Sequence, residues 1–151
     1  MSNLKTNRKR LRKKTKSVSR GKTRKNMPSR PAKIVVVGKI YADWCSHCIG
    51  MIPVWNKLEA HFKSMKNKRM NYKFQYEPVA IEQKNIAVEV PKLEQMYLSK
   101  SGDKIIVKGF PTIFRIFDGK IEYYEGERLY APMLRWFTNP HMSPKTPSVY
   151  Y

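Results

Sequence analysis

The 151-residue sequence lacks any long hydrophobic run, and its longest apolar run near the N-terminus is Ile34–Val37. A secretory signal needs roughly 7 to 15 apolar residues, and a membrane-spanning helix needs about 20. The sequence therefore shows no signal peptide and no transmembrane segment, and we expect no membrane partner. It predicts a protein of the cytosol or nucleus, where most thiols are kept reduced.

Acidic residues are absent from residues 1–33, which hold 14 lysines and arginines, whereas the other 118 residues hold 17 basic and 11 acidic residues. The few apolar residues of this segment show no period, so it cannot bury enough surface to offset the entropy of ordering it. We expect residues 1–32 to form a disordered basic arm and residues 33–139 to form one domain. The proline-rich residues 140–151 should form a flexible tail.

Aromatic residues are also absent from the arm, so base stacking cannot contribute to its interactions. Its charge can still neutralise phosphate groups, and we expect residues 1–33 to bind nucleic acid without sequence preference. A nuclear-import signal or a solubilising tail is the alternative. A small domain with such a basic arm is similar in composition to proteins packaged with nucleic acid, including virion proteins of large DNA viruses.

Between the arm and the tail, the apolar pattern predicts alternating strands and helices. Strands are predicted at residues 33–42, 72–81, 111–117 and 120–126, and helices over Cys48–Phe62, Val90–Lys100 and Ala131–Phe137. The first helix should bury one apolar stripe, made of Met51, Ile52, Trp55, Leu58 and Phe62. We expect Pro53 to kink the first helix, Pro78 to lie late in the second strand or at an irregularity, and Pro91 to begin the second helix. Asp118–Lys120 should form a tight turn. The order predicts an α/β layered fold with a mixed sheet.

Cysteine is scarce: the chain has only Cys45 and Cys48, both within the stretch YADWCSHC. Their spacing, with twelve residues between Cys48 and His61, begins like a zinc finger. The second histidine required about three to five residues later is missing, and the next one is His141. We therefore expect no metal, because a closed tetrahedral site is short of ligands. A static disulfide is a second alternative, but so short a loop would contribute only about 2 kcal/mol.

A redox pair explains the placement of the two cysteines best. The junction of a buried strand and a helix puts Cys45 at a helix N-terminus, where the macrodipole favours a thiolate. We expect His47 to lower the pKa of Cys45 as well. Cys48 follows one helical turn later, close enough to attack a mixed disulfide formed at Cys45. C-x-x-C near a βαβ pattern is typical of thioredoxin-like redox motifs, and no cofactor is expected beyond the pair.

With its surroundings, the motif resembles the thioredoxin-fold family over roughly residues 33–139, nearer to the protein disulfide isomerase branch than to thioredoxin itself. WCSHC is similar to the isomerase WCGHC, with Ser46 in place of glycine. Pro53 matches a helix-kinking proline, VKGFPTI resembles the cis-proline loop, and YEGER resembles Y-x-G-x-R. The resemblance implies that Cys45 is an exposed nucleophile and that Cys48 is the buried resolving thiol.

The same resemblance implies the neighbours of the pair. Pro111 would be the cis-proline whose loop pairs with a bound peptide, and Trp44, Phe110 and Thr112 would contact substrate beside it. Arg128 would swing toward Cys48 and lower its pKa. Simpler roles are the alternatives, since the aromatic rings can serve only as packing and Arg128 can be a solvated charge.

Two departures from the family stand out. The family usually opens with an additional strand and helix, whose place is taken here by the arm, so we expect a trimmed, four-stranded sheet. Six residues before the first cysteine, where the family keeps a buried acid, stands Lys39. This lysine either extends to the surface or stands beneath Cys48, where its charge would favour the thiolate and make the site a stronger oxidant.

The sequence thus predicts a monomeric, disulfide isomerase-like thiol–disulfide oxidoreductase that acts on protein or peptide disulfides. Its catalytic residues would be Cys45, Cys48, His47 and Arg128, with Lys39 tuning the pKa values. The alternative is a redox-silent binding module of the same fold, held to nucleic acid by the arm.

Overall fold

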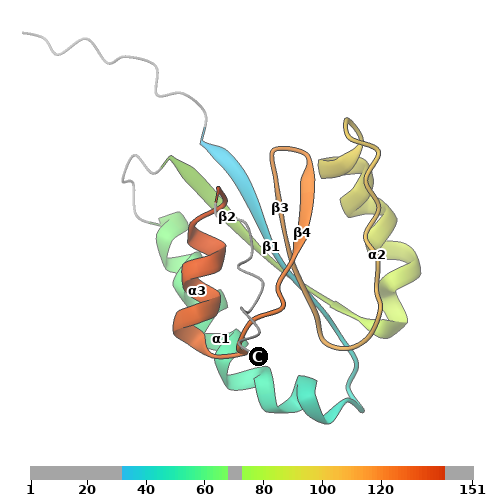
Figure 1. Cartoon of the computed structure of the whole chain (residues 1–151), viewed down its shortest axis with the longest axis vertical. Helices are drawn as coiled ribbons and strands as arrows, with labels where there is room; N and C mark the ends of the chain where they lie inside the picture. The colour runs from blue at the N-terminus through green and yellow to red at the C-terminus, as the bar shows by residue number, and fades with distance from the viewer. Residues whose placement is uncertain (1–31, 68–72, 142–151) are drawn as a thin grey trace, which may run out of the picture.

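The computed structural model describes residues 32–67 and 73–141, which form a sheet flanked by helices (Figure 1). The elements in chain order are β1 (Lys33–Tyr41), α1 (Ser46–Asn67), β2 (Phe74–Glu82), η1 (Gln83–Asn85), α2 (Ile86–Leu93), η2 (Glu94–Leu98), β3 (Thr112–Phe117), β4 (Lys120–Tyr123) and α3 (Tyr130–Thr138). The predicted order of strands and helices is confirmed. The predicted arm, apart from Ala32, and residues 142–151 of the predicted tail lie outside the described residues.

The four strands are arranged in the order β2-β1-β3-β4. β1 is parallel to β2 and antiparallel to β3, and β3 and β4 form an antiparallel hairpin, which confirms the mixed sheet. Asp118 and Gly119, with φ values of 53° and 78°, form the tight turn of that hairpin. Pro78 lies within β2, which has a neighbour on one side only among the described strands. An edge strand tolerates proline because it can lack a ladder donor on its outer side.

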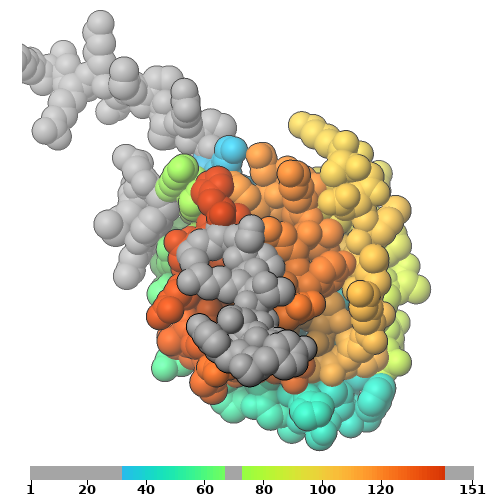
Figure 2. Space-filling view, viewed as in Figure 1, coloured from blue at the N-terminus to red at the C-terminus, as the bar shows by residue number. Residues whose placement is uncertain are grey.

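β1 is buried on both faces, as its continuous apolar run predicts. Val35 and Val37 pack with α1 and α3 on one face, and Val36 and Ile40 pack with α2 and η2 on the other. Figure 1 shows α1 and α3 together on one side of the sheet and α2 on the opposite side. The β1–α1 junction lies at the end of the molecule away from the β3–β4 turn, and the first turns of α1 are at the surface there (Figure 2).

Two local predictions about α1 have different outcomes. Pro53 lies inside the helix, and the ribbon changes direction after its first turns (Figure 1), as predicted. Ile52, however, is 44% exposed and does not belong to the buried stripe. The stripe is narrower than predicted because Met51, Trp55 and Leu58 already fill the space against the sheet at helical spacing.

The prediction for the second helix was wrong at its start. α2 begins at Ile86, after the short helix η1, so Pro91 lies inside the helix and not in its first turn. Ile86, Val90 and Leu93 recur at helical spacing and pack against the core, and this packing extends the helix toward the N-terminus. The loss of one backbone donor at Pro91 does not outweigh it.

A buried arginine fastens α3 to the sheet. Arg115 on β3 is fully buried, and its Nε donates to Glu122 Oε2 on β4 at 2.6 Å. Its Nη1 donates to the carbonyl oxygens of Trp136 and, at 2.9 Å, of Asn139. The Trp136 carbonyl oxygen also accepts the backbone N–H of Asn139 at 3.3 Å, so Arg115 adds a second donor there and joins the hairpin to the C-terminus of the helix.

The close approach of β1 and β3 yields a test of the packing. An ideal Cβ at Gly38 would lie 2.1 Å from the Phe114 ring, whereas one at Gly50 on α1 would meet nothing within 4 Å. We expect Gly38→Ala to lower the free energy of unfolding by about 1–3 kcal/mol through overpacking. Gly50→Ala should instead raise it by up to about 1 kcal/mol, because alanine favours a helix over glycine. Urea unfolding of the two variants measures both effects, and equal stability of Gly38→Ala and the parent would contradict the packing.

Candidate active site

Cys45 caps the N-terminus of α1. Its backbone N–H donates to the Ala42 carbonyl oxygen at 3.1 Å, which closes the turn after β1. Its own carbonyl oxygen accepts the N–H of Ile49 at 3.0 Å, the first hydrogen bond of the helix. This is the geometry of an N-cap residue, and it confirms that the cysteine pair stands at the strand-to-helix junction.

The sulfur of Cys45 accepts a hydrogen bond from the helix that it caps. The backbone N–H of Cys48 donates to Cys45 Sγ at 3.3 Å, and both cysteines are free thiols. Neither thiol is openly exposed: 7% of Cys45 and 3% of Cys48 are accessible, and Tyr41 and Phe110 pack against them. The resemblance implies an exposed Cys45 thiol, but in the structure Cys45 is mostly buried and only a small part of it is accessible.

The surroundings move the two thiol pKa values apart. The hydrogen bond from the Cys48 thiol, followed by the backbone N–H groups of Cys48 and His47 and the charge of Arg128, holds the pKa of Cys45 below its ordinary value despite burial. Burial, followed by the hydrogen bond to Cys45, raises the pKa of Cys48, and the charge of Lys39 opposes this rise. Cys45 is therefore the thiol that ionises first.

His47 lowers the pKa of Cys45 by a different route from the predicted one. Its side chain is exposed, and it lowers the pKa of Cys45 through its backbone N–H. The predicted contribution of the imidazole is not among the interactions that set this pKa. The N–H groups at the helix N-terminus, and not the imidazole ring, therefore lower the pKa of Cys45.

The loop before β3 faces the cysteine pair. The Phe110–Pro111 peptide bond is cis, as the resemblance implies. The Cys45 thiol donates to the Phe110 carbonyl oxygen at 3.5 Å, which joins loop and helix directly. Thr112 donates its hydroxyl to the Gly109 carbonyl oxygen at 2.6 Å, so this hydroxyl closes the loop from within.

Trp44 forms an exposed wall beside the pair. It is 72% accessible, and its ring meets the ring of Phe110 edge to face at 5.9 Å between centroids. Its indole N–H donates to Gln83 Oε1 at 2.8 Å, which ties the turn after β1 to η1. Sequence reasoning missed Gln83, and no spacing or motif could have revealed a partner 39 positions away.

Lys39 does not extend into open solvent, since it is 7% exposed. Its Nζ lies 4.6 Å from the centroid of the Tyr41 ring and 5.2 Å from that of Trp55. Burial lowers the pKa of Lys39, while the charges of Cys48 and Glu59 act in the opposite direction. Glu59 was also missed, although its position eleven residues after Cys48 on one helix puts both on similar faces.

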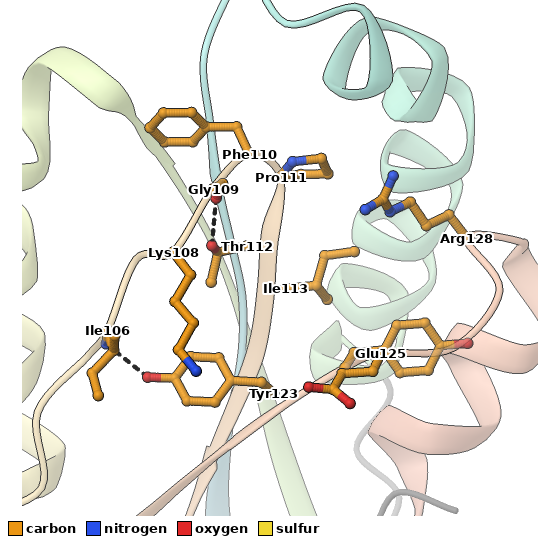
Figure 3. Close-up of a pocket in the computed structure, with 11 residues that line it drawn as sticks. Ile106, Lys108, Gly109, Phe110, Pro111, Thr112, Ile113, Tyr123, Glu125 and Arg128 are labelled. Carbon is orange, nitrogen blue, oxygen red and sulfur yellow. Dashed lines mark hydrogen bonds between the residues drawn. The ribbon is translucent and has the colours of Figure 1, made fainter. Parts of the chain in front are cut away.

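Arg128 lies in the segment between β4 and α3 and is exposed. It lines a pocket together with Pro111, and its guanidinium group points toward that proline (Figure 3). Its charge lowers the pKa of Cys45. The resemblance implies an action on Cys48, so the structure brings Arg128 to the other thiol of the pair.

Two further findings concern the described residues. No group of three or more histidine, cysteine, aspartate or glutamate side chains within them is arranged to hold a metal ion. None of their helices is long and apolar enough to cross a membrane.

Comparison with known proteins shows a match over most of the chain. The family model described as Thioredoxin matches residues 20–138. A protein disulfide-isomerase of Ricinus communis is 27% identical over 94 residues, and a thioredoxin domain-containing protein of Theileria parva is 32% identical over 88 residues. These alignments cover 62% and 58% of this chain, but the chain spans only 15% and 30% of those two relatives.

Among solved structures, human ERp44 in a zinc-bound form superposes with a TM-score of 0.50 at 17% identity. The superposition covers 75% of this chain and 28% of that protein. At this identity the likeness concerns the fold alone.

The separated thiol pKa values predict selective alkylation. In the reduced protein, Cys45 should react with iodoacetamide at lower pH than Cys48, because only the thiolate is nucleophilic. Arg128→Gln should move the alkylation profile of Cys45 to higher pH, and Lys39→Gln should move that of Cys48 to higher pH, since each variant removes a cation that favours one thiolate. Mass spectrometry of the labelled peptides resolves the two profiles. Alkylation of Cys48 before Cys45 would reverse the assignment.

Proposed function

The chain belongs to the thioredoxin family, and from this membership we propose that it is a thiol–disulfide oxidoreductase that exchanges disulfides with protein substrates through Cys45 and Cys48. The observation that supports this most directly is the 3.3 Å hydrogen bond from the Cys48 N–H to Cys45 Sγ. A sulfur that caps a helix is held where its negative charge is favoured.

The proposed reduction of a substrate disulfide proceeds in two exchanges. The Cys45 thiolate attacks one substrate sulfur, and the other substrate sulfur leaves as a thiolate that takes a proton from solvent. Cys48 then loses its proton to solvent and attacks Cys45 Sγ, which releases the second substrate thiolate. The substrate disulfide gains two electrons and the Cys45–Cys48 pair loses them, and the reverse sequence oxidises a substrate dithiol.

Lys39 would assist the second exchange. Cys48 attacks as a thiolate, but its burial disfavours that charge. The ammonium group of Lys39 offsets part of this cost by lowering the pKa of Cys48. Lys39 would therefore be a positioning charge for the resolving step in a site without the family's strand carboxylate.

The loop before β3 and Trp44 would hold the substrate. Phe110 packs against the cysteine pair, Pro111 follows it across the cis peptide bond, and the exposed ring of Trp44 meets the ring of Phe110. The Thr112 hydroxyl is engaged within the loop, so Thr112 would shape the loop and contact substrate only through its other atoms. His47 would contribute its backbone N–H at the capped sulfur.

The isomerase-like character of the protein is part of the proposal. The Ricinus relative is a protein disulfide-isomerase of which this chain spans 15%. One CxxC pair suffices for reduction, oxidation or rearrangement of a substrate disulfide, and we propose a monomer that performs such exchange in the cytosol or nucleus.

Substitution of each cysteine tests the proposal. Cys45→Ser should abolish disulfide exchange with a model protein disulfide, since it removes the attacking sulfur. Cys48→Ser should instead accumulate mixed disulfides between Cys45 and substrate, because resolution is lost. Non-reducing electrophoresis and mass spectrometry detect these adducts. Full turnover by Cys45→Ser, or failure of Cys48→Ser to form adducts, would favour the redox-silent binding module.

The basic arm supports a second activity. Residues 1–33 hold 14 basic residues and no acid, and such a segment attracts phosphate groups whatever its conformation. We propose that it binds nucleic acid without sequence preference and keeps the redox domain near it, as in the packaged proteins that it resembles in composition. Nucleic-acid binding is thus proposed for the arm and not for the domain that the structure describes.

Removal of the arm separates the two activities. Deletion of residues 1–32 should abolish the binding of duplex DNA or RNA at low salt and leave disulfide exchange unchanged. For the full chain, each phosphate neutralised should add about −0.9 to the slope of log affinity against log salt on duplex DNA. Fluorescence anisotropy across a salt series measures it. Undiminished binding by the truncated protein would show that the arm is not responsible.

A further inference from the structure

A pocket of about 400 Å³ is lined by Phe110, the residue of the loop before β3 that packs against the cysteine pair. The loop before β3 forms one wall, with Lys108 and Pro111, and the end of β4 and the segment after it form the other, with Tyr123, Glu125 and Arg128 (Figure 3). The pocket lies beside the cis peptide at Phe110, whose carbonyl oxygen meets the Cys45 thiol at 3.5 Å. The pocket and the Cys45 thiol therefore have Phe110 as a common neighbour.

Two cations line this pocket. The Arg128 guanidinium group points toward Pro111, and the Lys108 side chain runs along the opposite wall toward the ring of Tyr123 (Figure 3). Both side chains are exposed, and neither forms an ion pair within residues 32–67 and 73–141. Glu125 is the single carboxylate among the described residues of the lining. The pocket thus keeps unpaired positive charge toward an incoming chain.

We propose that Lys108 and Arg128 form a subsite for acidic side chains, which selects protein disulfides whose cysteine has Asp or Glu within a few residues. This proposal rests on the disulfide exchange proposed above and names its substrate class. The charge of Arg128 already reaches Cys45. A residue one to three positions from the substrate cysteine lies up to about 10 Å from it along an extended chain, so a substrate held at Cys45 can extend past Phe110 toward the pocket that this residue lines.

The two cations have different roles in the proposed subsite. Arg128, whose charge acts on Cys45, both favours the Cys45 thiolate and attracts the substrate carboxylate. Lys108 has no contact with the cysteine pair and acts on the substrate alone, so its substitution separates recognition from reactivity. Glu125 opposes the preference, because its carboxylate repels an acidic residue that enters the pocket.

The test is a single exchange between the reduced full chain and short peptides whose cysteine forms a mixed disulfide with 5-thio-2-nitrobenzoate. The Cys45 thiolate attacks the peptide sulfur, and the coloured thiolate leaves with the bonding electron pair, so no further reductant is needed. Two peptides are compared, one with Asp and Glu beside the cysteine and one with Asn and Gln at the same positions. Stopped-flow absorbance gives the two second-order rate constants.

We expect the parent protein to prefer the acidic peptide by about two- to tenfold at low salt, since one exposed ion pair contributes up to about fivefold. Lys108→Gln should lower the ratio of the two rate constants, so that about half or more of that preference is lost. Glu125→Gln should increase the preference, and 1 M salt, with a Debye length of about 3 Å, should remove it.

Lys92→Gln is the matched control, because it removes the same charge from an exposed position on α2 outside the pocket. It should retain the parent preference. An equal loss in Lys92→Gln and Lys108→Gln would assign the preference to the overall charge of +20 and overturn the subsite. Equal rates for both peptides with the parent protein would overturn the subsite and leave the exchange activity standing. Reaction with neither peptide would overturn both proposals.

Discussion

The backbone N–H of Cys48 points at the sulfur of Cys45, and the chemistry of the site depends on this hydrogen bond. It exists because β1, buried on both faces, ends at Tyr41 and a single closed turn then places Cys45 ahead of α1. The orphan N–H groups of a helix N-terminus need an acceptor. Here that acceptor is a thiol sulfur, so the requirement for a helix cap also favours its ionised form.

Each thiol of the pair has its own cation, supplied by a different part of the chain. Arg128, after β4, lowers the pKa of Cys45, and Lys39, within β1, lowers that of Cys48. Burial and the hydrogen bond between the thiols still raise the pKa of Cys48. Cys45 therefore ionises at a lower pH than Cys48. The burial of Lys39 against Tyr41 and Trp55 holds a positive charge at a strand position where a carboxylate would act as a base.

Much of this arrangement could be predicted from the sequence, because it depends on local patterns. The apolar run of β1, the CxxC pair at its end and the proline of the loop before β3 each identify their element without knowledge of the fold. The predictions failed where tertiary packing determines the bounds of an element or the partners of a side chain. The start of α2 depends on which apolar residues reach the core, not on where Pro91 stands. Gln83 reaches the site only through the folding of a distant segment, and no motif marks it. Glu59 shares α1 with Cys48, but its action on Lys39 depends on how α1 packs against β1.

Pro78 has a consequence for the behaviour of the protein in concentrated solution. A sheet whose outermost strand exposes a regular row of donors and acceptors is a template on which another chain can add a strand. β2 is the outermost described strand on its side of the sheet. Within this strand, Pro78 lies opposite Val37 of β1 and has no backbone N–H. Proline at an edge interrupts such a row, so this edge strand resists edge-to-edge aggregation by its own sequence.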